Sequence, residues 1–346
     1  MLKRRAILSC ALLPLAATAC ASSGSTGNDV TRIAFVQDLT APDADEHALP
    51  ALQAAQLAIA MQSSEGVRVE LTAFDLAEDP SAVAQIESDP SFVAAIAGPG
   101  ADGSTMAEAG VPTVSVSTVG PTPDVGAWRR SVAPIEFVAD AIVAELEGAE
   151  PCVLSEEPAP DPLVGLLTER LGEPSAILHP AETGPFVAGN GCDAVAWAGS
   201  PDAGAEVTRS LPGGVAVVGG DRLLDPDFLD AGSAAEGARA ACACVDLSTS
   251  IDPVAMRFIQ DYQSEFGSAP GPYAVEAWDA TRLLLGLLAQ GTRGERVAAA
   301  LVQVESLEGL GGTYRFATSG ELAEPSGSVG VSELRSGRWV RLGPST

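Results

Sequence analysis

The chain has 346 residues, 46% of them hydrophobic, and its formal net charge is −27 at pH 7. Nucleic-acid binding needs basic patches that displace counterions from phosphates, and 46 acidic against 19 basic residues exclude it. The hydrophobic content is high enough for a folded core, so the acidity indicates a well-solvated surface and not disorder. A body of this length exceeds what one core usually holds, and two lobes are expected.

The first residues have the layout of an export signal. Basic residues at 3–5 precede an apolar stretch, 6–19, that ends at Cys20. This stretch is shorter than the roughly 20 residues that a membrane-spanning helix needs, so we expect residues 1–19 to be removed. Removal takes three basic and no acidic residues, and the charge falls from −27 to −30. Residues 20–30 are rich in Ser, Gly and Thr and are expected to form a flexible tether.

The small residues before Cys20 resemble a bacterial lipobox. The resemblance implies that Cys20 receives lipid and becomes the mature N-terminus, which anchors the protein to the outer face of the cell membrane. Ordinary cleavage near this point, with a free secreted product, is the alternative.

Short apolar runs then alternate with longer Ala- and Leu-rich stretches. In the first half we expect strands at 33–36, 67–74, 93–97 and 111–116, and helices at 48–62 and 81–88. A second series has expected strands at 152–154, 175–178, 194–198, 215–218 and 240–245, and helices at 137–147, 161–171 and 203–211. Alternation of this kind predicts parallel sheets with helices on both faces, and two similar series predict two similar lobes.

The last third begins with two expected helices, 253–266 and 273–290. Short strand-type runs separated by turn residues follow at 313–316, 329–331 and 339–342.

The segment 256–289 carries a recognisable pattern. Its members are Phe258, Tyr262, Phe266, Gly267, Pro272, Tyr273, Ala274, Glu276, Ala277, Trp278, Asp279, Ala280, Leu283 and Leu284. Motifs in the same order precede and follow it, at 74–75, 79–80, 96–99, 110–115, 199, 219–221, 296–301 and 309–316. Together they resemble the type I periplasmic-binding-protein family, especially the branched-chain amino-acid-type receptors of ABC importers, over essentially the whole mature chain.

This resemblance implies an α/β fold with two doubly wound parallel-sheet lobes joined by three crossovers. The crossovers are expected near Val132, 246–250 and 305–309. Lobe 1 is then expected to comprise 31–131 plus 250–306, and lobe 2 to comprise 132–249 plus 307–346. Ligands of open α/β sheets bind at the carboxyl ends of the strands, and pockets form preferentially between domains, so a hinged inter-lobe site is expected.

Candidate ligand contacts in lobe 1 follow its strands. Relatives bind a ligand carboxylate with serine after a Gly-Pro pair, where this chain has Ala101 and Asp102; Asp102 would repel a carboxylate, so Ser104 is the expected substitute. Ser117 and Thr118 offer hydroxyl and N–H groups, with strand or helix capping as an equally weighted alternative. The full set of lobe 1 candidates is Asp38, Thr40, Gly100, Ala101, Asp102, Ser104, Ser117 and Thr118.

Candidates in lobe 2 are mainly acidic. Glu156, Glu157, Ser200 and Asp221 come directly after expected strands. Carboxylates there could bind an ammonium or another cationic group through charge-assisted hydrogen bonds, and plain surface charge is the alternative.

Four cysteines remain after Cys20, and an even number in an exported protein favours disulfides. Cys152 and Cys192 lie on or beside strands that are neighbours in the order 2-1-3-4-5, within disulfide reach. Cys242 and Cys244 are left for each other. A metal site on this C-x-C pair is the alternative, but the chain has only two histidines and neither is nearby in sequence.

No H-E-x-x-H, G-x-S-x-G or P-loop pattern is present, and we expect neither an enzyme nor a cofactor. The sequence predicts an extracytoplasmic solute-binding lipoprotein of an ABC importer, which captures a small amino-acid-like metabolite between its lobes and delivers it to a permease. Ala101 and Asp102 motivate an alternative, a non-transport sensor or interaction lipoprotein with altered or lost ligand binding. An exported hydrolase is a third hypothesis.

Overall fold

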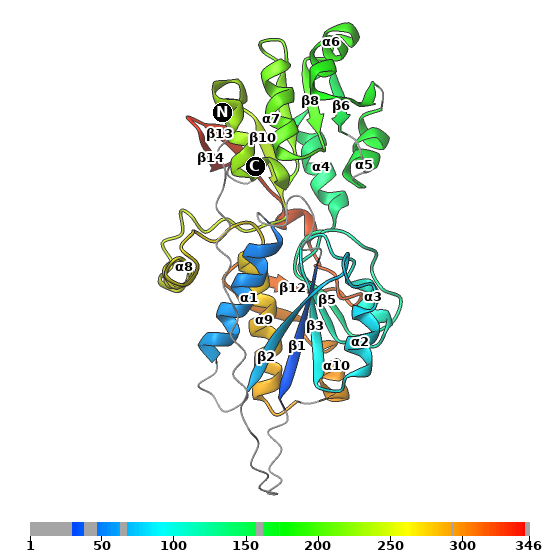
Figure 1. Cartoon of the computed structure of the whole chain (residues 1–346), viewed down its shortest axis with the longest axis vertical. Helices are drawn as coiled ribbons and strands as arrows, with labels where there is room; N and C mark the ends of the chain where they lie inside the picture. Colours follow the sequence, from blue (N-terminus) through cyan, green and yellow to red (C-terminus); the bar gives the residue numbers. More distant parts are fainter. Residues whose placement is uncertain are drawn as a thin grey trace, which may run out of the picture.

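The computed structural model describes residues 30–37, 47–62, 68–156, 162–172, 174–292 and 294–342. Two α/β bodies lie one above the other along the long axis of the molecule (Figure 1). We call the lower body, built on a five-stranded sheet, lobe 1, and the upper body, built on a seven-stranded sheet, lobe 2. The predicted fold class, α/β with parallel sheets, is confirmed.

Lobe 1 has the strand order β2-β1-β3-β4-β5, with every pair parallel. Its strands are β1 (Thr31–Gln37), β2 (Val69–Asp75), β3 (Phe92–Ala97), β4 (Thr113–Ser115) and β5 (Trp128–Arg130). Its helices are α1 (Ala48–Gln62), α2 (Ala82–Ser88), α3 (Ser104–Glu108), α8 (Pro253–Phe266), α9 (Ala274–Ala289) and α10 (Glu295–Leu301). α1 packs on α9, so a late segment of the chain completes the core of the first lobe.

Lobe 2 has the strand order β14-β13-β10-β9-β8-β6-β7, in which β13 and β14 are antiparallel additions at one edge. Its strands are β6 (Pro151–Ser155), β7 (Ser175–Ile177), β8 (Ala194–Trp197), β9 (Ala216–Gly219), β10 (Arg239–Cys242), β13 (Gly330–Arg335) and β14 (Arg338–Arg341). Its α-helices are α4 (Ile135–Glu145), α5 (Pro162–Leu171), α6 (Pro180–Asn190) and α7 (Pro201–Ser210). Its 3-10 helices are η1 (Asp221–Leu224), η2 (Pro226–Ala235) and η3 (Pro325–Ser328), and η3 leads into β13. The five parallel strands of each lobe follow the order 2-1-3-4-5.

Three connections join the lobes. The first, 131–134, links β5 to α4, and the second, 243–252, links β10 to α8. The third, 316–329, links β12 (Gly312–Arg315) to β13 and lies later in the chain than the expected 305–309. It lies later because β11 (Ser306–Gly309) and β12 form a separate hairpin, which is held on α9 of lobe 1.

Asp279 of α9 holds this hairpin. Its carboxylate accepts the N–H groups of Leu310 at 2.8 Å and Gly311 at 2.9 Å, and the hydroxyl of Tyr314 at 2.9 Å. Asp279 is buried, and burial raises its pKa although the three donors oppose the shift. Buried carboxylates of this kind are retained only when they are well hydrogen-bonded.

Helix ends show where local sequence sets structure. α8 has the predicted bounds: the Asp252 side chain accepts the N–H of Val254 and Ala255, and Gly267 ends the helix in the left-handed region at φ 78°. α6 was not predicted, because Pro185 and two glycines lie inside it, and these residues disfavour helix interiors.

Both cysteine pairs lie at bonding distance. The Cα atoms of Cys152 and Cys192 are 5.8 Å apart, and those of Cys242 and Cys244 are 5.1 Å apart. No cluster of three or more His, Cys, Asp or Glu side chains suited to a metal ion occurs among the described residues. The described helices also include none that is both long and apolar enough to span a membrane.

Candidate functional site

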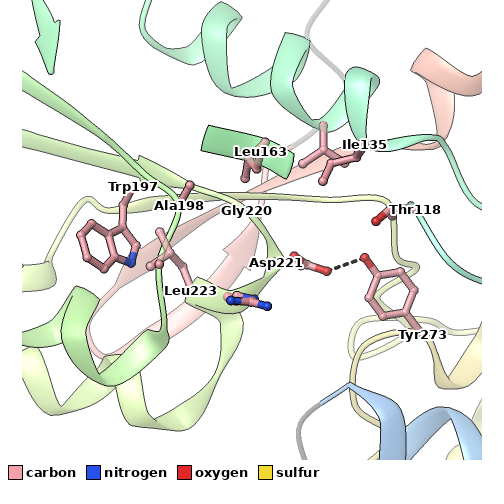
Figure 2. A pocket seen from close by; sticks show the side chains of 12 residues that line it. Thr118, Ile135, Leu163, Trp197, Ala198, Gly220, Asp221, Leu223 and Tyr273 are labelled. Carbon is pink, nitrogen blue, oxygen red and sulfur yellow. Dashed lines mark hydrogen bonds between the residues drawn. The ribbon is translucent and has the colours of Figure 1, made fainter. Parts of the chain in front are cut away.

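A pocket is lined by residues of both lobes (Figure 2). Its empty volume is about 420 Å³, open solvent included. Lobe 1 contributes Thr118 and Tyr273, and lobe 2 contributes Ile135, Val138, Leu163, Trp197, Ala198, Gly199, Gly220, Asp221, Arg222 and Leu223.

The lobe 2 wall consists largely of strand ends. Gly199 follows β8 and Gly220 follows β9, and because these parallel strands are neighbours, their carboxyl ends open at the same edge of the sheet. A Cβ at Gly199 would lie 2.3 Å from the ring of Trp197, so only glycine fits there. The indole Nε1 of Trp197 donates to the carbonyl of Ser200 at 3.1 Å, which fixes the ring against the wall.

Asp221 is the central polar group of this pocket. It begins η1, and its side chain is 28% exposed. The hydroxyl of Tyr273 donates to Asp221 Oδ2 in a short hydrogen bond, and His47 Nε2 lies 4.0 Å from the same oxygen. Two lobe 1 side chains therefore contact one carboxylate of lobe 2.

Tyr273 is held in an unusual way. It is 2% exposed and has φ 62°, in the left-handed region that non-glycine residues rarely adopt. Burial, with the neighbouring Asp221 carboxylate as the second cause, raises the pKa of Tyr273 well above its ordinary value, so the hydroxyl stays protonated and acts as a donor. A backbone conformation of this type persists where the surroundings enforce it, and such residues cluster at functional sites.

The pocket combines one carboxylate with apolar walls. Ile135, Val138 and Leu163 supply aliphatic surface, and Thr118 supplies a hydroxyl. A small molecule with a cationic hydrogen-bond donor and an apolar part fits this chemistry.

Two predicted site residues, Thr118 and Asp221, line the pocket, and the other described candidates do not. Asp102 Oδ1 accepts the N–H of Ser104 at 3.0 Å and its hydroxyl at 2.6 Å, so these two residues bind each other beside Gly100 and Ala101 at the start of α3. Among the lobe 2 candidates, Ser200 donates its N–H to Glu156 at 2.8 Å. Asp38, Thr40, Glu157 and Cys20 lie outside the described residues.

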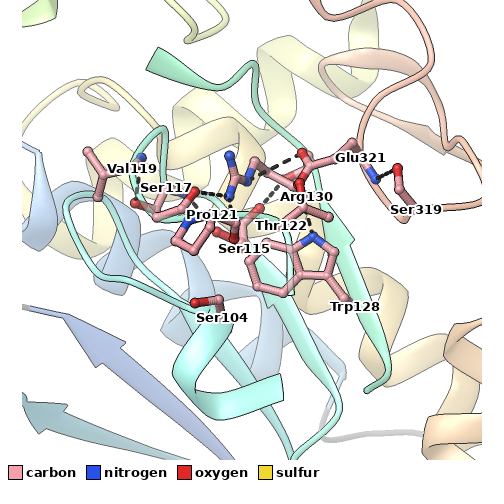
Figure 3. Close-up of polar contacts among 12 residues, drawn as sticks. Ser104, Ser115, Ser117, Val119, Pro121, Thr122, Trp128, Arg130, Ser319 and Glu321 are labelled. Carbon is pink, nitrogen blue, oxygen red and sulfur yellow. Dashed lines mark hydrogen bonds and ion pairs between the residues drawn. The ribbon is translucent and has the colours of Figure 1, made fainter. Parts of the chain in front are cut away.

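Ser117 caps a turn. It is fully buried, its N–H donates to Ser115 Oγ at 3.2 Å, and its own Oγ accepts the N–H of Val119 at 3.3 Å (Figure 3). These bonds correspond to the capping alternative for Ser117 alone, since Thr118 lines the pocket.

A buried arginine supports the loop that follows Thr118. Arg130 donates to the carbonyl of Gly120 at 2.6 Å, and its Nε lies 3.5 Å from Glu321 of the third connection (Figure 3). Glu321 also accepts hydrogen bonds from Thr122 at 2.7 Å and Trp128 at 3.3 Å. The loop that carries Thr118 is thereby tied to one of the segments joining the lobes.

Tyr273 and most of the lobe 2 wall were not predicted as site residues. Tyr273 belonged to the recognised motif at 272–274, but nothing in the sequence indicates its left-handed backbone or its contact with Asp221. The sequence predicts ordinary core positions for Leu163 and Trp197, because an apolar side chain in a pocket wall cannot be distinguished by sequence from one in a core.

Comparison with known proteins finds similar folds among solved structures. No family model matches the chain, and no curated protein matches it significantly. Among solved structures, the leucine binding protein LivK of Thermotoga maritima is similar with a TM-score of 0.71 at 19% identity, covering 91% of this chain and 98% of its own. LivJ of Streptococcus pneumoniae, solved with isoleucine, gives 0.72 at 15% identity and covers 90% of this chain and 100% of its own.

A third similar structure is the ABC-transporter solute binding protein RPA0668 of R. palustris, solved with benzoate. Its TM-score is 0.67 at 16% identity, with 91% of this chain and 96% of its own covered. Together with the two sheets of order 2-1-3-4-5 and the three connections, these neighbours show that the chain has the fold of type I periplasmic binding proteins.

Proposed function

We propose that this protein is an extracytoplasmic solute-binding protein of an ABC importer, whose ligand is a small amino-acid-like molecule with a cationic amine. The observation that carries the proposal is the Asp221 carboxylate in a pocket that both lobes line and whose apolar walls come from lobe 2. An ammonium group hydrogen-bonded to Asp221 would gain a charge-assisted bond, and the apolar walls would receive the rest of the solute.

The neighbours support this class of function. LivJ was solved with isoleucine and RPA0668 with benzoate, both small carboxylates. Neighbours described as a leucine binding protein and a transporter substrate binding protein favour a binding protein over an exported hydrolase.

We further propose the cellular context that the sequence predicts: export, lipid attachment at Cys20, and delivery of the solute to a permease. The lobe boundaries expected from the sequence, 31–131 plus 250–306 and 132–249 plus 307–346, also remain a proposal. The bonds of Asp279 favour counting the hairpin β11–β12 with lobe 1.

The second candidate is a non-transport sensor or interaction lipoprotein. It is favoured by the bond between Tyr273 and Asp221, because the protein's own hydroxyl already occupies part of the carboxylate that an ammonium would bind.

A thermal-unfolding screen against amino acids, polyamines, amides and urea distinguishes the solute-binding proposal from the second candidate. A solute that binds only the folded state stabilises it by about 2.7 kcal/mol at a hundred times its Kd. We expect one amine-bearing solute to raise the unfolding midpoint of the wild type and of Asp227→Asn, an exposed control, but not of Asp221→Asn. If no solute acts, or Asp221→Asn responds like the wild type, the transport proposal in this form is wrong.

A further inference from the structure

A second cavity lies where all three connections meet, and it shares no lining residue with the Asp221 pocket. Its empty volume is about 1110 Å³, open solvent included. Ser131 lines it from the first connection, Val245 and Asp246 from the second, and Glu324 from the third. Any ligand there would contact all three segments that join the lobes.

Glu276 of α9 lines this cavity and is only 1% exposed. One carboxyl oxygen accepts the N–H of Val245 at 2.6 Å, while the other, Oε2, is buried and has no hydrogen-bond partner in the described part of the chain. Burial raises the pKa of Glu276 to about 8. At neutral pH the carboxyl is therefore mainly protonated and carries an O–H group.

Arg341 of β14 lines the same cavity. Its Nη1 donates to the carbonyl of Cys244 at 3.0 Å, and a Cβ at Gly330 would lie 1.7 Å from its Cζ, so the guanidinium is held close over that glycine. Neither Arg341 nor Arg315, also in the lining, forms an ion pair with a described residue. Both guanidinium groups are exposed to solvent, and Arg341 lies close enough to Glu276 to lower the pKa of its carboxyl, against the larger effect of burial and the effect of the neighbouring Asp279 carboxylate.

The lining also contains two exposed acids, Asp246 and Glu324. Asp246 accepts the N–H of Ser248 at 2.7 Å. These acids disfavour multiply charged anions such as phosphate more than they disfavour a singly charged one.

We propose that this cavity is a binding site for a small monocarboxylate anion, held by the guanidinium of Arg341 and by an O–H···O bond from the carboxyl of Glu276. A guanidinium matches a carboxylate in two-pronged geometry, and a carboxyl group donating to a carboxylate forms a short, strong bond. The anion would accept a hydrogen bond from the carboxyl of Glu276 through Oε2, and further hydrogen bonds from the N–H groups of Arg341 that do not bind Cys244.

Acetate is the probe, and saturation-transfer NMR of its methyl group measures binding to the purified protein at constant ionic strength, set with chloride. We expect saturable binding at pH 7 that weakens about tenfold for each pH unit above 8, since the anion needs the protonated carboxyl. Glu276→Gln keeps the acceptor for Val245 and a donor on the other atom, so it should bind acetate without this pH dependence.

Arg341→Gln should weaken acetate binding at least tenfold. Arg338→Gln is the matched control, because Arg338 lies on the same strand, is exposed and does not line the cavity. If Arg341→Gln does not fold, as checked by urea unfolding, Arg341→Lys replaces it and should weaken binding several-fold, because a lysine lacks the planar fork. Asp221→Asn should leave acetate binding unchanged, which separates this site from the proposed solute pocket.

Three results would overturn the proposal. They are the absence of saturable binding at pH 7, equal binding by the Arg341 and Arg338 variants, and a fall in binding above pH 8 that persists in Glu276→Gln.

Discussion

Replacing the buried Glu276 with glutamine should stabilise the protein, and by an amount that depends on pH. The pKa of this carboxyl is raised from 4.5 to about 8 by burial, which means that the folded state holds its proton more tightly than the unfolded chain does. Below pH 4.5 both states are protonated and the residue causes no penalty. Between pH 4.5 and about 8 the unfolded chain ionises while the folded protein does not, so stability is lost as pH rises.

The magnitude follows from the two pKa values. Each unit of difference corresponds to about 1.4 kcal/mol, so the penalty is about 3 kcal/mol at pH 7 and levels off near 5 kcal/mol above pH 8. Glutamine removes the ionisation but keeps the oxygen that accepts the Val245 N–H. We expect Glu276→Gln to match the wild type near pH 4.5 and to exceed its stability by these amounts at higher pH.

Urea unfolding followed by circular dichroism at pH 5, 7 and 9 measures this difference. Glu265→Gln, an exposed position on α8, is the control and should show no pH-dependent gain. A gain for Glu276→Gln that is the same at pH 5 and pH 9, or a variant less stable than the wild type at pH 9, would refute the reasoning.

Three further changes test the packing between segments, each by urea unfolding. Asp279→Asn should cost about 2–4 kcal/mol, because three donors, two partly buried N–H groups and the buried Tyr314 hydroxyl, lose a carboxylate acceptor; a loss below 1 kcal/mol would contradict this role. Replacing both Cys152 and Cys192 with alanine should cost about 4 kcal/mol, since the pair closes a loop of 40 residues, and reduction of the wild type, which also opens Cys242–Cys244, should cost at least as much; a loss below 1 kcal/mol would contradict a bond between Cys152 and Cys192. Arg130→Met should cost about 3–5 kcal/mol by leaving Glu321 without its positive partner, and the double variant with Glu321→Gln should recover part of this loss; no recovery would argue against the pairing.

Much of the fold could be predicted because local signals agree with the global structure. The apolar runs at 33–36 and 93–97 became central strands, since buried parallel strands need continuous apolar sequence. α8 begins and ends at the predicted residues because Asp252 and Gly267 are cap residues by chemistry. β5 was missed, since its three residues include two arginines that only tertiary contacts bury.

The candidate site was less predictable than the fold. Asp221 and Thr118 carry polar groups directly after expected strands, and the sequence indicated both. Tyr273 could not be found in this way, because its role depends on a left-handed backbone and on a carboxylate 52 residues earlier in the chain. The third connection was placed too early, since only the contact with Asp279 reveals that the hairpin belongs beside α9.

Native mass spectrometry of the protein, incubated with an equimolar pool of amino acids and polyamines, tests the central claim most directly. One bound solute per chain, identified by its mass as an amine, is the result expected for the wild type and for Asp227→Asn. Asp221→Asn should appear without it. A wild type that carries no solute, or an Asp221→Asn protein that carries the same solute to the same extent, would contradict the account of a cationic group bound by Asp221.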